Sequence, residues 1–91
     1  MTDTDLRATL LRVIGDDEQL HRLLCEAGFL PPRDEALSRE HLELARVART
    51  LASELEVNWE GIEIILRMRA ELLATQRQVF ELLRLLRGGP R

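Results

Sequence analysis

The chain has 91 residues, a formal charge of −3, and 13 arginines but no lysine. Its length allows one small domain, or one domain with a protruding helix, because so short a chain cannot enclose two cores. An aromatic content of 3% leaves leucine to fill the interior, which favours helical packing. The acidic balance argues against a nucleic-acid-binding module, since such modules usually carry excess basic residues that neutralise phosphates.

The cellular environment is indicated by what the sequence lacks. Cys25 is the only cysteine, so an internal disulfide is excluded. This cysteine usage is most consistent with a protein in a reducing compartment. The start MTDTDLRATLL has no basic region followed by an apolar run, and no uncharged 18-residue segment could cross a bilayer. We therefore expect a cytoplasmic protein without a membrane anchor.

The first predicted element is a short helix over Thr4–Ile14. Leucine, valine and isoleucine recur there at helical spacing. Thr4 or Asp5 is the expected cap, and Gly15 is the expected stop.

A second short helix is predicted directly after Gly15. Asp16 or Asp17 can cap it, Gly28 ends it, and its inward face consists of Leu20, Leu23, Leu24 and Ala27. Two short helices around a glycine turn predict helix-turn-helix topology.

A proline-containing connector separates this pair from the third helix. Residues 29–32, Phe-Leu-Pro-Pro, cannot continue a helix because proline lacks an amide donor, and residues 33–37 complete the connector. Ser38 is the expected cap of a helix that runs to about Glu56. His41, which we expect to be exposed, stands where a capping box would have Glu or Gln.

The fourth predicted helix is much longer than the others. Val57-Asn58-Trp59 forms a break with Asn58 as the cap, and no helix breaker follows until Gly88-Gly89-Pro90. A helix from Trp59 to about Arg87 would be about 40 Å long, which exceeds what a domain of this size can cover. Residues 1–57 are therefore expected to form a helix-turn-helix-like domain with a third helix, and 58–91 a long helix with a short disordered tail.

Two apolar stripes follow this long helix. A seam with alternating spacings of three and four residues, typical of a coiled coil, consists of Ile65, Met68, Leu72, Thr75, Val79, Leu82 and Leu86. The second stripe consists of Ile62, Leu66, Leu73, Phe80 and Leu83. One stripe can serve the domain and the other a second copy of the chain, which predicts a homodimer through the seam. The alternative is that the helix folds back onto the first two helices.

The joint before the long helix contains Trp59, the only tryptophan. An indole at this position can cover the corner between two helices, and Gly61 allows another group to approach closely. We interpret Trp59, Gly61 and Ile62 as a structural corner; direct contact with a ligand is the alternative.

The residues indicate no catalytic, cofactor or metal site. His21 and Cys25 lie four residues apart on one helix, but two ligands do not make a zinc site, and a helical cysteine among leucines is usually a core residue. The glycines form no phosphate-binding loop. We therefore expect a protein that is not an enzyme.

The layout of the chain resembles that of MerR-like helix-turn-helix proteins. The resemblance covers about Leu6 to Leu86 and rests on LCEAGFLPP at residues 24–32 and LSREHLELARVARTLASELEVNWEGIEIILRMRAEL at 37–72. Within that group, the joint Leu-x-x-Asn-Trp-x-Gly-Ile is similar to the Leu-Asp-Trp-x-Gly-Ile segment of chaperone modulators of the CbpM type. The resemblance implies an all-α fold of four helices, with a MerR-like helix-turn-helix and a long C-terminal dimerisation helix.

The same resemblance implies a function. Such modulators bind the J-domain of a DnaJ-like co-chaperone of the CbpA type and block its stimulation of DnaK. A J-domain presents a basic helix, so an acidic surface would complement it. The candidate contact residues are Asp16, Asp17, Glu18, Glu26, Asp34 and Glu35. Their alternative role is to cap helices and solvate a surface.

Two rival functions remain open. A MerR-like DNA-binding regulator is favoured by the topology and by arginines that might share a face, namely Arg7, Arg12, Arg22 and Arg33. Against it, MerR readers carry basic residues on the second helix and a basic wing, whereas here both segments are acidic. The other rival is a helical interaction module that is unrelated to chaperones.

Overall fold

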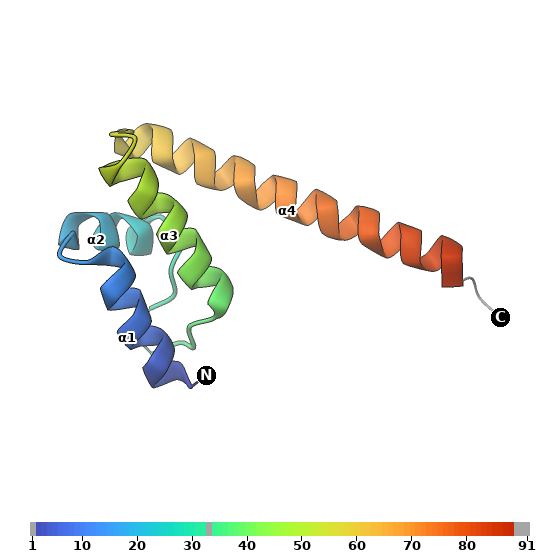
Figure 1. Cartoon of the computed structure of the whole chain (residues 1–91), viewed down its shortest axis with the longest axis horizontal. Coiled ribbons are helices and arrows are strands. Elements are labelled where there is room, and N and C mark those ends of the chain that lie inside the picture. Colours follow the sequence, from blue (N-terminus) through green and yellow to red (C-terminus); the bar gives the residue numbers. More distant parts are fainter. Residues whose placement is uncertain (1, 33, 89–91) are drawn as a thin grey trace.

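The computed structural model describes residues 2–32 and 34–88, which form four α-helices and no strand. Helix α1 spans Asp3–Ile14, α2 Glu18–Glu26, α3 Arg39–Ser53 and α4 Trp59–Gly88. The first three helices pack together, and α4 leaves them as a long rod (Figure 1). The predicted all-α architecture with a long C-terminal helix is confirmed.

Helix α1 begins earlier than the sequence analysis predicted. Its cap is Thr2, not Thr4 or Asp5. The Thr2 hydroxyl accepts a hydrogen bond from the Asp5 N–H at 3.2 Å, and the Asp5 carboxylate accepts one from the Thr2 N–H at 3.4 Å. This reciprocal capping box satisfies two amides at once, so the helix starts at the residue after Thr2. The predicted stop is confirmed, because Gly15 caps the C-terminus with a φ of 68°.

Helix α2 is capped by the second of the two predicted aspartates. Asp17 Oδ1 accepts a hydrogen bond from the Leu20 N–H at 3.0 Å. Leu20 and Leu24 are buried, whereas Leu23 and Ala27, also predicted to face inward, are half-buried. Ala27 caps the C-terminus, and the chain then turns through Gly28 at a φ of 85°.

Helix α3 begins at the predicted cap, and its capping box is completed by histidine. The Ser38 hydroxyl accepts from the His41 N–H at 3.3 Å, and His41 Nδ1 accepts from the Ser38 N–H at 2.9 Å. The imidazole thus replaces the Glu or Gln of an ordinary box. The expectation that His41 is exposed is wrong, because this contact leaves it half-buried.

The predicted end of α3 at about Glu56 is also wrong. The helix ends at Ser53 with Glu54 as its cap, and Glu56 adopts a left-handed φ of 53°. The chain then turns back, so that the Val57 N–H reaches the Leu51 carbonyl at 2.8 Å. A left-handed residue is usually glycine or asparagine, so a glutamate there gives no signal in the sequence.

One apolar core holds the domain together, and it includes the start of α4. Its buried members come from all four helices and the connector: Leu6, Leu10, Ile14, Leu20, Leu24, Leu30, Leu37, Leu42, Ala45, Ala48, Ile62 and Leu66. The side chain of Arg49 on α3 also donates a hydrogen bond to the Ile14 carbonyl at the end of α1. The first two turns of α4 are therefore anchored in the domain that precedes them.

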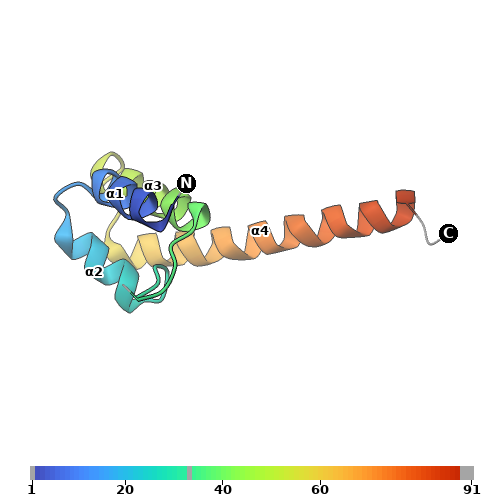
Figure 2. The same ribbon diagram turned by 90° about the horizontal axis from the view of Figure 1, so that it is seen from below.

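Beyond Leu66, α4 extends away from the domain. The two views agree that its C-terminal half touches no other helix (Figures 1 and 2). Leu86 is 80% exposed and Phe80 72% exposed. The alternative in which α4 folds back onto α1 and α2 is therefore wrong. The predicted disordered tail at 89–91 lies outside the described residues.

Candidate partner-binding surfaces

The corner between α3 and α4 is built around a cap and a glycine. Asn58 Oδ1 accepts a hydrogen bond from the Gly61 N–H at 2.9 Å, and the Asn58 carbonyl accepts from the Ile62 N–H at the same distance. A Cβ at position 61 would lie 2.7 Å from Val57 Cγ1 and 3.1 Å from Asn58 Oδ1. Gly61 is therefore the residue that lets the turn close tightly against the helix.

Trp59 covers this corner from the side of the connector. Its ring meets the ring of Phe29 edge to face, with centroids 6.4 Å apart. The Arg67 guanidinium lies 5.3 Å from the Phe29 centroid and is held by Glu63 at 2.8 Å. Phe29 and Trp59 are both half-buried against the core, as is expected of rings that fix a joint.

The six candidate acids do not form a single patch. Asp16, Asp17 and Glu18 lie at the N-terminal end of α2, whereas Glu26 lies at its C-terminal end. Asp34 and Glu35 follow on the connector, and both are exposed. The two ends of this nine-residue helix are about 12 Å apart. The acids thus follow α2 and its connector along their length.

Some of these acids stabilise the fold, and others are exposed and could contact a partner. Asp17 is half-buried and its side chain caps α2, so its role is structural. Glu26 forms an ion pair with Arg22 at 4.0 Å. Each of the two side chains is 67% exposed, so the pair adds little stability. Asp16, Glu18, Asp34 and Glu35 are exposed and present charge to solvent.

The arginines proposed for DNA contact are engaged in local interactions. Arg7 donates to the carbonyls of Pro32 at 3.4 Å and Glu35 at 2.5 Å, which ties the connector to α1. Arg12 donates to the Thr9 hydroxyl at 3.2 Å. Arg7 and Arg12 are five residues apart on one helix and so do not share a face. Arg33 lies outside the described residues.

The predicted seam on α4 is exposed along its length. Each of its apolar members is exposed: Ile65, Met68, Leu72, Val79, Leu82 and Leu86. The second stripe divides at Leu66: Ile62 and Leu66 are buried in the core, whereas Leu73, Phe80 and Leu83 are exposed. Only its first two members therefore serve the parent domain. The outer half of α4 presents both stripes to solvent, a broad apolar face of the kind that marks an association site.

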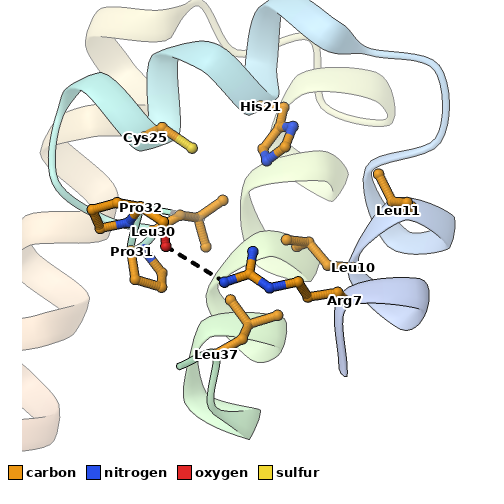
Figure 3. A pocket seen from close by; sticks show the side chains of 9 residues that line it. All are labelled: Arg7, Leu10, Leu11, His21, Cys25, Leu30, Pro31, Pro32 and Leu37. Carbon is orange, nitrogen blue, oxygen red and sulfur yellow. Dashed lines mark hydrogen bonds between the residues drawn. The ribbon is translucent and has the colours of Figure 1, made fainter. Parts of the chain in front are cut away.

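A groove that sequence reasoning missed lies between α1, α2 and the connector (Figure 3). It has a volume of about 570 Å³ and is lined by Arg7, Leu10, Leu11, His21, Cys25, Leu30, Pro31, Pro32 and Leu37. The apolar connector Phe29-Leu30-Pro31-Pro32 is the signal that could have indicated it, because loops are usually polar. We call this feature the connector groove.

The polar groups of the connector groove are few. The side chains of His21 and Cys25 point into it from α2, and the Arg7 guanidinium reaches across from α1 toward the Pro32 carbonyl (Figure 3). Cys25 is exposed, so its interpretation as a core residue is wrong. Among residues 2–32 and 34–88, no three His, Cys, Asp or Glu residues are grouped so that they could hold a metal ion. The groove is thus suited to apolar contact with a polar edge.

In the part of the chain that the structure describes, no helix has the length and apolarity needed to cross a membrane. Comparison of the chain with protein-family models, curated proteins and solved structures finds no match.

Proposed function

We propose that this protein is a cytoplasmic adaptor without enzymatic activity that binds the J-domain of a DnaJ-like co-chaperone of the CbpA type. Binding would inhibit the stimulation of DnaK by that co-chaperone. The proposal adopts what the resemblance to chaperone modulators of the CbpM type implies.

The observation that carries this proposal is the position of the resembling motif. The residues Asn58, Trp59, Gly61 and Ile62 occupy the joint at which α3 turns into α4. Asn58 caps the helix, and the Trp59 ring covers the corner. Gly61 allows the close approach of Val57, and Ile62 is buried in the core. A motif that fixes the direction of a long helix supports a shared architecture more strongly than a leucine pattern would.

The proposed mechanism is steric. Exposed carboxylates along α2 and the connector would attract a basic helix of the J-domain and cover the face that DnaK needs. No covalent step is involved, so inhibition would be reversible. Because the charges are at the surface, association should weaken as salt rises.

We further propose that the protein acts as a homodimer through the seam of α4. The exposed leucines from Leu72 to Leu86 support this, because a broad apolar face left in water favours self-association. A domain this small also gains stability when it associates.

Titration against the cognate J-domain tests the function. We expect binding at micromolar concentration in low salt, with affinity falling as salt is added. The control is the double variant Glu18→Gln with Glu35→Gln. Both acids are exposed, so their replacement should weaken binding without destabilising the fold. Absence of binding at low salt would remove the proposal.

A DNA-binding regulator is the rival, favoured by the short α1–α2 pair that has helix-turn-helix order. A gel shift on the protein's own promoter region separates the two functions. Retardation that weakens steeply with salt would favour the regulator. We expect no specific retardation, because α2 begins with an acidic cap and an acidic first turn.

A further inference from the structure

We propose that the connector groove receives one amphipathic helix of a partner protein, with leucine-like side chains on the inner face and basic residues on the flanks. The inference rests on the proposed function and deepens it by naming the docking surface. Helix-in-groove docking is a common mode of peptide recognition, in which apolar anchors at helical spacing enter a hydrophobic channel.

The walls of the connector groove present apolar surface to solvent. Leu11 is 61% exposed although it lies on the inner side of α1 facing α2, and Pro32 is exposed on the opposite wall. Leu10, Leu30 and Leu37 form a buried floor. An apolar side chain that entered between these walls would cover Leu11 and Pro32 without displacing the core.

The shape of the groove is fixed from both sides. The Arg7 hydrogen bonds to the Pro32 and Glu35 carbonyls hold the connector against α1. On the other side, Phe29 is held by Trp59 and Arg67 of α4. A groove built in this way does not have to form when the partner arrives, which lowers the entropic cost of binding.

The charged residues around the groove indicate which charge the docking helix should carry. Glu18 lies three positions before His21 and seven before Cys25, so it lies on the same side of α2 as these two residues. Asp34 and Glu35 border the connector side. The described residues on these rims thus carry three carboxylates, those of Glu18, Asp34 and Glu35, against the guanidinium groups of Arg7 and Arg22. This excess favours a basic flank on the docking helix.

A second copy of the chain could offer a similar helix. The end of α4 carries exposed leucines beside Arg77, Arg84 and Arg87. We favour a different protein, because the α4 seam is already proposed to pair with its counterpart in the homodimer and because Arg84 is paired with Glu81.

Cys25 supplies the reporter for the test. It is the only cysteine, it is exposed and its sulfur points into the groove. The rate at which a disulfide reagent such as DTNB modifies the full chain would be measured with two probes. One is the J-domain, and the other is a synthetic helix of about 16 residues with leucines on one face and arginines elsewhere. A second peptide, with glutamate in place of arginine, is the charge control.

We expect each of the first two probes, at saturation, to slow the modification of Cys25 at least about fivefold, and the acidic peptide to leave the rate unchanged. A charged residue on the apolar wall of the groove should also block docking, because the partner's leucine-like side chains would have to bury the charge. Leu11→Glu should lower the affinity for both probes at least about tenfold. Leu55→Glu, at an equally exposed leucine outside the groove, should leave the affinity within about twofold of the wild type.

The outcomes distinguish this inference from the proposed function. If the J-domain binds but neither protects Cys25 nor responds to Leu11→Glu, the groove is not the docking surface although the function stands. If the basic peptide protects Cys25 and the J-domain does not bind, the groove inference holds and the function fails. Protection that rises with the concentration of the protein alone would make a second copy the occupant and overturn the proposed partner.

Discussion

Trp59 and Phe29 meet edge to face, with ring centroids 6.4 Å apart and ring planes at 74°. This contact joins the first turn of α4 to the connector that follows α2, two segments that are 30 residues apart. Arg67 lies against the same Phe29 ring about two turns further along α4. Together the three side chains set the direction in which the long helix leaves the domain.

Replacing Trp59 tests this joint. Because the ring is half-buried, we expect Trp59→Ala to lower the free energy of unfolding by about 2–3 kcal/mol, below the cost of a fully buried tryptophan. Trp59→Phe keeps an aromatic edge against Phe29 and should cost about 1 kcal/mol. Urea unfolding followed by circular dichroism measures both. An alanine variant as stable as the wild type would assign the ring to partner contact.

Glycine-to-alanine changes in α4 should have opposite consequences at its two ends. Gly61→Ala places a methyl group 2.7 Å from Val57 Cγ1, so we expect a loss of about 1–3 kcal/mol although alanine is the better helix former. Gly88→Ala meets no atom within 4 Å and should be neutral or slightly stabilising. Equal effects at both positions, measured by thermal unfolding, would mean that the turn before α4 is loose.

Two variants test whether His41 acts as part of the cap of α3. His41→Ala removes the acceptor for the Ser38 N–H and should cost about 1 kcal/mol. His41→Gln supplies a side-chain oxygen at the same position and should restore most of that loss. Chemical denaturation of the two variants is the comparison. If glutamine and alanine cost the same, the ring does not act as part of the cap.

The proposed homodimer depends on the exposed seam of α4. Leu72→Glu with Val79→Glu places charges within it, and light scattering should then give the mass of one chain where the wild type gives two. The matched control is Ala70→Glu with Arg77→Glu, which has the same seven-residue spacing on the polar face. A mass unaffected by the seam variant would place the contact elsewhere.

The sequence predicted the helices where single residues act as local signals. Gly15, the prolines at 31 and 32, Ser38 and Asn58 each have a local role that does not depend on the rest of the fold. Prediction failed where several residues could play that role. Thr2, Thr4 and Asp5 are all capable caps, and only the reciprocal bond between Thr2 and Asp5 decides among them.

The connector groove could not be predicted in this way. Its walls come from Leu11, Cys25 and Pro32, which lie on three segments whose separation depends on tertiary packing. For the same reason, the partners of Trp59 were not foreseen: Phe29 reaches it only because the connector crosses the start of α4. The six acids were different, because the predicted bounds of the second helix already placed them at its two ends and on the connector.

We propose above that this protein inhibits a J-domain co-chaperone by occupying its J-domain. The most direct test of this proposal is the steady-state ATPase rate of DnaK, stimulated by the cognate J-domain protein, as increasing amounts of the chain are added. We expect a dose-dependent fall to the unstimulated rate, reversed by excess J-domain and weakened by salt. A stimulated rate that stays constant when the chain is in molar excess at low salt would contradict it.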